Sequence, residues 1–331
     1  MQAVKKPVGG VDYPVDWAQY LDWFHAEDAC RNYVEKLRWP DGFVCPQCGV
    51  ASELEPQSRH RLICPACRHQ ASATAGTIFE KTRTELRVWF GAIWFITSQK
   101  HGASALGLQR VLGLGSYETA WTMLHRLRRA MVRPERELLQ GRVEVDETYL
   151  SLTDRFNPRS PVGRKSGTAK VLLVIAVEMP GAKRLGRIRI RQIERPDHKN
   201  LLQFVQDCIN PGALIHTDGS STYRVFKDNG YALEQTVHLR SGQAAHETMP
   251  GVHRVAALLQ RWMMGTHHGA VQPAQLDYYI DEFVFRFNRR TSTSRGLLFY
   301  RLMQQAVATT PVTYSQIAST LRTKQSVELR G

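Results

Sequence analysis

The sequence predicts a multi-domain α/β protein in which a small metal-binding ribbon and a helical region precede a mixed sheet flanked by helices. Three observations lead to this fold class. The chain has 331 residues, more than one typical domain. Two C-x-x-C pairs lie near the N-terminus. From Arg142 onward, apolar strand patterns alternate with helical ones.

The cysteine pairs predict a zinc ribbon at residues 41–80. Cys45, Cys48, Cys64 and Cys67 follow the pattern C-x2-C-x15-C-x2-C. Two thiolates two residues apart can bind one ion, and four thiolates suit tetrahedral Zn²⁺ with no position left for a substrate. A redox dithiol is the alternative, but two pairs in this order do not resemble one redox site. We therefore expect one structural Zn²⁺ in the ribbon. An N-terminal segment at 1–40, helical over 16–38, is expected to precede the ribbon.

Residues 84–135 are predicted to be helical throughout. A short helix is expected to begin at Ser104, followed by a glycine turn and a longer helix capped by Ser116. This is the outline of a helix-turn-helix. The basic residues of the last helix are candidates for DNA contact: Arg126, Arg128 and Arg129. A plain helical hairpin with a solvated basic face is the alternative.

Residues 140–290 are predicted to form a mixed sheet flanked by helices. Three strands, a helix, a strand, a helix, a strand and a helix follow one another, which is the order of an RNase-H-like fold. Asp146 lies in the first strand and Asp218 ends the fourth. In that fold the two strands are parallel neighbours, so we expect them to end side by side with both carboxylates at one rim, where a divalent metal can be held. A loop is expected at 151–170 and a C-terminal helical tail at 291–331.

A third metal ligand is expected from the helix that follows the fifth strand. This helix, predicted at 252–264, has no carboxylate but carries His253, and Glu247 is the nearest acid upstream. His253 as a ligand or proton shuttle, Glu247 as a ligand, and no third ligand at all (including an inactive site) stay open. Glu144 shares the strand face of Asp146 and Glu147 points the other way, so both are expected in solvent or behind the metal ligands.

The charge of the chain favours a polyanionic partner. Lys and Arg number 44 against 30 Asp and Glu, a net charge of +14, and nucleic acid is the commonest partner of such a protein. A soluble protein that happens to be basic is the alternative. Further candidates for phosphate contact, with a solvated basic surface as the alternative, are Arg159, Arg164, Lys165, Lys170, Arg254 and Arg261.

No membrane association is expected. The N-terminus has no apolar core typical of a secretory signal. The longest apolar run, Leu86–Thr97, is too short to span a bilayer and is better explained as a buried helix. We expect a cytoplasmic protein associated with the nucleoid.

In these features the chain resembles bacterial insertion-sequence transposases of the DDE superfamily, from the branch with an N-terminal zinc ribbon and an RNase-H-like catalytic domain. The matching motifs are the four ribbon cysteines, Ala75–Phe79, Val145–Tyr149, Thr217–Gly219 and Tyr279–Arg290. The resemblance implies metal-dependent cleavage of DNA at element ends and transfer of the 3′-hydroxyl to target DNA. It also implies two Mg²⁺ or Mn²⁺ ions at Asp146 and Asp218, with His253 at the place of the third ligand, and a homodimer or larger assembly on double-stranded DNA.

One position departs from the family pattern. The family often has Glu or Asn as third ligand and Lys seven residues later, where this chain has His253 and Gln260. Mg²⁺ prefers oxygen ligands, whereas imidazole suits Mn²⁺ better. We therefore expect an enzyme with a relative preference for Mn²⁺. The alternatives are a catalytically decayed, transposase-derived DNA-binding protein and a structure-specific RNase-H-like nuclease that cuts without joining.

Overall fold

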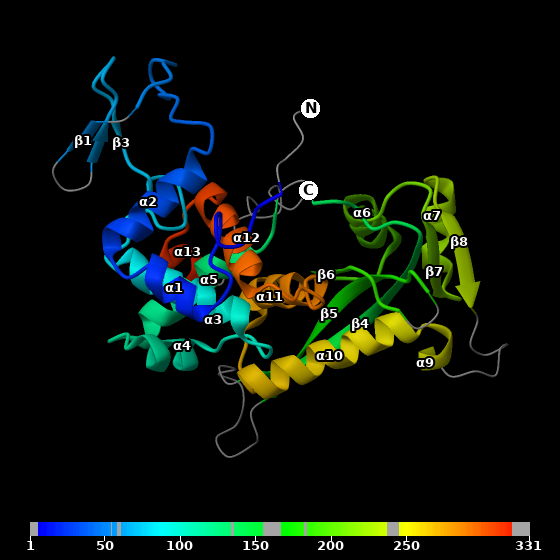
Figure 1. Ribbon diagram of the computed structural model, residues 1–331. Coiled ribbons are helices and arrows are strands. Elements are labelled where there is room, and N and C mark those ends of the chain that lie inside the picture. Colours follow the sequence, from blue (N-terminus) through cyan, green and yellow to red (C-terminus); the bar gives the residue numbers. More distant parts are fainter. Residues whose placement is uncertain are drawn as a thin grey trace. The chain divides into compact units, whose positions relative to one another are not determined.

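The computed structural model describes residues 6–53, 55–57, 61–133, 136–154, 167–181, 184–236 and 245–319. These residues form two compact units (Figure 1). The first combines Met1–Arg133 with Ser292–Ala318, and the second consists mainly of Pro134–Thr291. The C-terminal helices therefore complete the N-terminal unit.

The first unit is a helical body joined to a small three-stranded sheet. Its helices are α1 (Trp17–Trp23), α2 (Glu27–Arg38), α3 (Leu86–Ser98), α4 (Ala105–Leu112), α5 (Tyr117–Ala130), α12 (Arg295–Ala308) and α13 (Tyr314–Ala318). The antiparallel strands are β1 (Glu55–Gln57), β2 (Arg61–Ile63) and β3 (Gln70–Ala71). Phe299 of α12 packs against Phe24 and Phe90, with ring centroids 5.6 and 5.8 Å away. Burial of these aromatic rings holds the C-terminal helix in the N-terminal core.

The continuous helix predicted over 16–38 is wrong, because the chain breaks between α1 and α2. Phe24 leaves the helical region of backbone space, with φ −114° and ψ 35°. Its buried ring then packs edge-on against Phe90, 4.7 Å between centroids. The gain from this tertiary packing outweighs the local helical periodicity on which the prediction depended.

Helices α4 and α5 follow the predicted short helix, glycine turn and longer helix. The Ser104 side chain accepts a hydrogen bond from Gly107 N and caps α4. Gly113 ends this helix with φ +63°, a conformation that glycine adopts at little cost. Ser116 caps α5 by accepting from Glu118 N.

The second unit is built on a five-stranded sheet in the order β6-β5-β4-β7-β8. The strands are β4 (Arg142–Asp154), β5 (Gly167–Glu178), β6 (Ile188–Gln192), β7 (Leu214–Asp218) and β8 (Ala232–Thr236). Strands β4, β5 and β6 are antiparallel neighbours, whereas β4, β7 and β8 are parallel. The first strand of the unit is therefore central with the fourth parallel beside it, which confirms the predicted RNase-H-like sheet.

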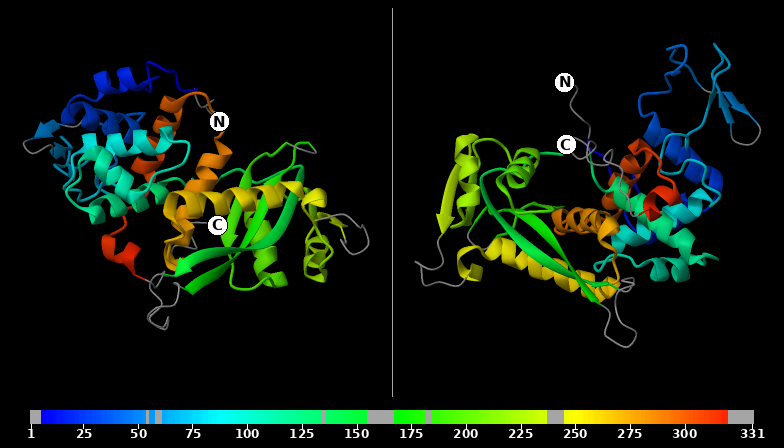
Figure 2. Two further views of the ribbon diagram at one scale, coloured as in Figure 1. Left: turned by 90° about the horizontal axis from the view of Figure 1, so that it is seen from below. Right: turned by 180° about the vertical axis from the view of Figure 1, so that it is seen from behind.

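Helices cover both faces of this sheet (Figure 2). One core contains α6 (His198–Cys208), η2 (Ser221–Arg224) and α7 (Val225–Asp228). The other contains α10 (Pro250–His267) and α11 (Leu276–Asn288); α9 (Ala245–Thr248) precedes α10, and η3 (Pro273–Gln275) precedes α11. Successive residues of β5 alternate between the two cores, with Leu172 and Val174 toward α6 and Leu173 and Ile175 toward α10.

Two expectations about the strands need correction. The predicted loop at 151–170 is shorter, since β4 and β5 continue their pairing from Ser151↔Lys170 to Asp154↔Gly167. The buried Leu150 and Leu152 anchor this extension. Strand β4 therefore does not end beside β7, and Asp146 lies in its interior.

Among the described residues, no helix is long and apolar enough to cross a membrane.

Candidate functional site

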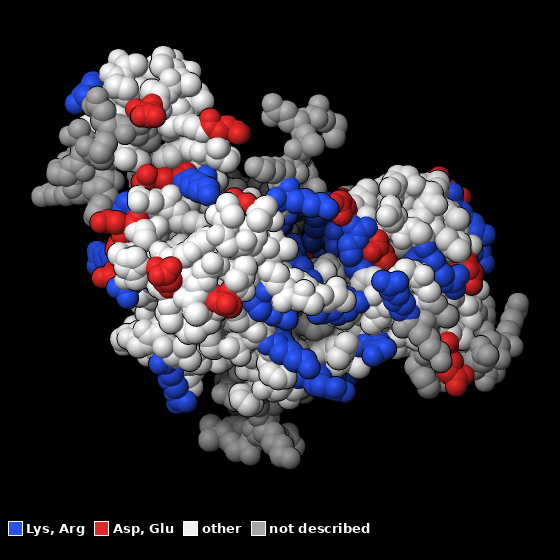
Figure 3. Space-filling view, viewed as in Figure 1, with Lys and Arg blue, Asp and Glu red and all other residues white. Residues whose placement is uncertain are grey.

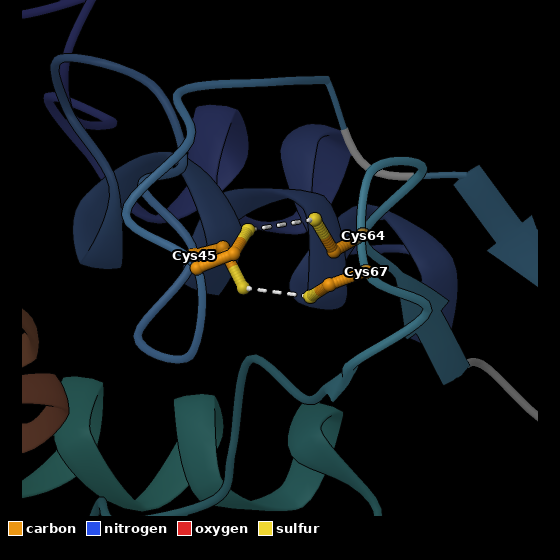
Figure 4. Close-up of side chains that lie close together, drawn as sticks. Cys45, Cys64 and Cys67 are labelled. Carbon is orange, nitrogen blue, oxygen red and sulfur yellow. Dashed lines mark hydrogen bonds between the residues drawn. The ribbon is translucent and has the colours of Figure 1, made fainter.

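The four ribbon cysteines converge on one point. Cys45 Sγ lies 3.6 Å from Cys67 Sγ, and Cys48 Sγ lies 3.8 Å from Cys64 Sγ. All four sulfur atoms lie within 4.8 Å of one another, and Figure 4 shows Cys45 facing Cys64 and Cys67 across the gap between the two loops. Tetrahedral Zn²⁺ with bonds of about 2.3 Å requires sulfur atoms about 3.8 Å apart. The donor set therefore fits this ion.

The protonation of these thiols also suits a cation. A hydrogen bond from the backbone N–H of Cys67 lowers the pKa of Cys64 to about 6. A backbone hydrogen bond from His69 lowers the pKa of Cys67, but burial and the neighbouring cysteine sulfur atoms outweigh it and raise this pKa to about 12. Four thiolates cannot coexist this closely without a positive ion, which would remove that opposition.

Asp146 and Asp218 occupy adjacent parallel strands. Strands β4 and β7 pair as far as Glu144↔His216, so Asp146 and Asp218 each lie two residues beyond the last pair. Asp146 Oδ1 accepts from Glu147 N at 2.8 Å, and Asp218 Oδ1 accepts from Ser220 N at 2.9 Å. Oδ2 of both aspartates makes no hydrogen bond within the described part of the chain. One oxygen of each is thus oriented by the backbone, and the other is available to a cation.

The electrostatics of this pair are those of a crowded acidic site. Burial, together with the nearby charges of Glu147, Asp218 and Glu144, raises the pKa of Asp146 to about 7 against a backbone hydrogen bond from Glu147. Carboxylates that share a site oppose one another's ionisation, and a divalent cation reverses that preference. Oxygen ligands of this kind suit Mg²⁺ or Mn²⁺.

Glu144 is buried. Of the two positions expected from the sequence, in solvent or behind the metal ligands, the first is therefore wrong. Its side chain shares the α10 face of β4 with Asp146, is only 2% exposed, and accepts from Val252 N at 3.0 Å. Met249, the residue that precedes α10, has no side-chain cap, so Glu144 caps the helix from the sheet. Gly251 permits this approach, because a Cβ there would lie 2.8 Å from Glu144 Oε2 and 2.5 Å from Met179 Sδ.

Glu147 points to the opposite face of the sheet from Asp146, as predicted. Its Oε2 accepts a 2.5 Å hydrogen bond from Tyr223 Oη of η2. Burial raises the pKa of Glu147, and the charge of Asp218 adds to this effect against the hydrogen bond from Tyr223. Sequence reasoning missed Tyr223; its position in the turn that follows Asp218 is the signal by which it could have been found.

The candidates for a third ligand lie at different places. His253 is half-buried in the first turn of α10, next to the Val252 N–H that Glu144 binds. Glu247 is exposed on α9, in a short helix and not in the expected loop. Among the described residues only the four cysteines bring three or more potential ligand atoms within 4.8 Å of one another. Asp146, Asp218 and His253 therefore do not form a closed set at that distance.

The basic residues of α5 are engaged inside the first unit. Arg128 is 1% exposed and donates to Ala103 O at 3.2 Å, which argues against the predicted DNA contact. Arg126 is half-buried and donates from Nε to Val312 O at 2.9 Å. Arg129 donates to Thr310 Oγ1 at 3.0 Å. The bonds of Arg126 and Arg129 hold the segment after α12 against α5, so packing accounts for side chains that were candidates for DNA contact.

The remaining basic candidates belong to the second unit. Arg254 and Arg261 are exposed and lie two turns apart on one face of α10, and Lys170 is exposed on β5. Arg159, Arg164 and Lys165 lie outside the described residues. On the face of the second unit seen in Figure 3, Lys and Arg side chains predominate over Asp and Glu.

Two family models match the chain. Residues 25–70 match the transposase zinc-ribbon domain, and residues 138–288 match the ISXO2-like transposase domain. A protein of the transposable element ISH50 from Halobacterium salinarum is 25% identical over 280 residues, covering 80% of this chain and 91% of its own length. One chain of the cryoEM structure of a simian T-cell lymphotropic virus intasome in complex with PP2A regulatory subunit B56 gamma is 16% identical. The match covers 62% of this chain and 74% of the intasome chain, with a TM-score of 0.31.

The two matched domains are the two halves of the resemblance noted in the sequence. The four converging cysteines lie in the zinc-ribbon match, and Asp146 and Asp218 lie in the match to the ISXO2-like transposase domain. The chain belongs to the insertion-sequence transposases of the DDE superfamily that carry an N-terminal zinc ribbon.

Proposed function

We propose that this protein is an active transposase that cleaves DNA at the ends of its element and joins the new 3′-hydroxyl to target DNA. The observation that carries the proposal is the pair of aspartates two residues beyond the last β4–β7 pair, each with one oxygen oriented by a backbone N–H and one available. The similarity to a protein of the transposable element ISH50 supports it.

The chain's own residues would divide the work as follows. Asp146 and Asp218 would hold two Mg²⁺ or Mn²⁺ ions, with His253 as the third ligand or as a proton acceptor. When bound, these ions supply activation of the attacking oxygen and stabilisation of the leaving one. Exposed Arg254 and Arg261 would neutralise DNA phosphates beside the site. Glu144 would keep His253 in place by capping α10.

We further propose one structural Zn²⁺ at Cys45, Cys48, Cys64 and Cys67. The ribbon has a small core in which Phe43, Cys45 and Cys64 are the buried members. Such a core supplies little stabilisation, so metal binding would provide much of the folding free energy of the ribbon.

We also propose that the protein acts on double-stranded DNA as a homodimer or larger assembly, because two element ends must be handled together. Its net charge of +14 suits this partner. Light scattering with and without element-end DNA tests the assembly: one protomer per end complex at all concentrations would contradict it.

A joining assay tests the main proposal. Purified protein, Mn²⁺, labelled end DNA and a plasmid should give joined product. Cut product without joining would identify a nuclease, and a mobility shift alone would identify a DNA-binding protein without activity. Asp146→Asn should reduce joining at least about 100-fold and leave the mobility shift intact. Asp228→Asn, at an exposed acid on α7, is the matched control and should join as the wild type does. Joining that survives Asp146→Asn would disprove the site.

A further inference from the structure

The backbone ladder between the two catalytic strands stops short of the aspartates. Pairing of β4 with β7 ends at Glu144↔His216, two residues before Asp146 and Asp218. Beyond that point each strand is held from its other side. Asp146 pairs with Ile175 of β5, and Asp218 pairs with Thr236 of β8. The distance between the carboxylates is therefore not set by backbone hydrogen bonds between their own strands.

Asp218 and the turn after it are bound firmly to β8. Gln235 Nε2 donates to Asp218 O at 3.1 Å and to Ser220 O at 2.8 Å. These bonds fix the Asp218 turn relative to β8 and leave its position relative to β4 to other contacts.

One side-chain hydrogen bond crosses from the turn back to β4. Tyr223 Oη donates to Glu147 Oε2 at 2.5 Å. Within the described residues, this is the only hydrogen bond between 146–154 and 217–224. Tyr223 is 1% exposed and packs in one core with Val145 and Ile215, one residue from each strand. Its ring therefore has little freedom, and the bond connects two well-held points.

Both ends of this bond lead directly to an aspartate carboxylate. The backbone N–H of Glu147 donates to Asp146 Oδ1 at 2.8 Å. Tyr223 belongs to η2, which begins after Ser220, and Ser220 N donates to Asp218 Oδ1 at 2.9 Å. A displacement of either partner would consequently move the carboxylate oxygens that these N–H groups orient.

We propose that the Tyr223–Glu147 hydrogen bond sets the distance between Asp146 and Asp218 at which they can hold the two metal ions. We call this hydrogen bond the clasp. It makes Tyr223 and Glu147 positioning residues that act from the opposite face of the sheet, and it rests on the proposed function. Partners that orient metal ligands are typically worth 10- to 100-fold in metal affinity or activity. If Glu147 instead bound a metal ion directly, it would be a ligand and not a positioning residue. The variants described below distinguish these two roles.

Four variants of the full-length protein test the clasp by Mn²⁺ titration of joining and by calorimetric Mn²⁺ binding. Tyr223→Phe removes the donor and keeps the ring, and should raise the half-saturating Mn²⁺ concentration roughly 10-fold. Glu147→Ala should do the same. Glu147→Gln retains an oxygen acceptor for the phenol and should stay within about threefold of the wild type. The double variant Tyr223→Phe/Glu147→Ala should be no worse than either single variant, because both remove one bond.

Tyr231→Phe is the matched control. Tyr231 is a buried tyrosine of the same core, and its hydroxyl donates to Ile209 O at 3.3 Å, away from the aspartates. Its loss should leave the Mn²⁺ dependence unchanged. If Tyr223→Phe behaves like Tyr231→Phe, the clasp is refuted.

Two further outcomes decide against the proposal or for it. Glu147→Gln as damaging as Glu147→Ala, with Tyr223→Phe mild, would make Glu147 a ligand and overturn the clasp. If Tyr223→Phe fails to fold, a contrast between a near-normal Glu147→Gln and a weakened Glu147→Ala sustains it. Failure of the proposed function is separate: wild type and Asp146→Asn would then bind Mn²⁺ equally and neither would join.

Discussion

The two candidate metal sites of this protein are built in opposite ways. The zinc site takes its four ligands from two short loops, and its sulfur atoms close to within 4.8 Å of one another. The candidate ligands of the aspartate site come from strands distant in the chain, and one oxygen of each aspartate makes no hydrogen bond within the described residues. A closed shell stabilises a fold, whereas an open one leaves positions for a substrate. Local spacing is therefore enough to specify the first site, but the second depends on supports elsewhere in the sheet.

The largest difference between the sites should appear on metal removal. Chelation of zinc, or Cys64→Ser, should unfold the ribbon, because structural zinc sites contribute about 10–16 kcal/mol of apparent binding free energy. Limited proteolysis should then cleave around residues 43–71 and leave the second unit intact. Asp146→Asn should retain one equivalent of zinc and a protected ribbon. A ribbon that resists proteolysis after zinc is lost would break this comparison.

The aspartate site should instead cost stability when it holds no metal. The pKa of Asp146 rises from 3.8 to about 7 in the folded protein, so the folded state binds more protons than the unfolded state between these values. The unfolding free energy of the metal-free protein should therefore fall as pH rises from about 4 to 7, by a few kcal/mol at about 1.4 kcal/mol per pKa unit.

Asp146→Asn should remove this penalty. The variant should unfold at higher denaturant concentration than the wild type at pH 8 without metal, and its stability should change less between pH 5 and pH 8. Added Mn²⁺ should narrow the gap by stabilising only the wild type. Denaturant titrations at the two pH values measure both effects. A metal-free Asp146→Asn protein less stable than the wild type at pH 8 would contradict the proposed cause.

The sequence predicted the features that depend on local spacing and missed those that depend on contacts between distant segments. The cysteine spacing, the strand order and the two aspartates were all visible in local patterns, and the sheet order confirms the arrangement. The role of Glu144 was not visible, because it depends on where α10 begins against β4. Arg128 was a candidate for DNA contact and is buried instead, because the sequence of a basic helix face is the same whether the face is solvated or packed. Contacts between distant segments could not be predicted from the spacing of residues in the sequence.

The cap on α10 offers a smaller and more local test of how the open site is supported. Gly251→Ala would place a Cβ 2.5 Å from Met179 Sδ and 2.8 Å from Glu144 Oε2, so the start of α10 must shift. We expect a loss of about 1–3 kcal/mol in stability and of roughly 10-fold in joining.

Gly265→Ala on the same helix is the control. A Cβ there meets nothing within 4 Å, and alanine in a helix should stabilise by about 0.5–1 kcal/mol. Equal tolerance of the two substitutions in melting and joining assays would show that the approach of Glu144 to α10 is not required.

The smallest expected effect concerns the choice of metal. With imidazole at His253 in place of an oxygen ligand, joining should be several-fold faster in Mn²⁺ than in Mg²⁺. His253→Glu should shift this ratio toward Mg²⁺, because a carboxylate is the ligand that Mg²⁺ prefers. Glu247→Gln, at the exposed acid of α9, should leave the ratio unchanged if His253 is the third ligand. Equal wild-type rates in the two metals would remove the preference, and loss of activity in Glu247→Gln alone would transfer the ligand role to Glu247.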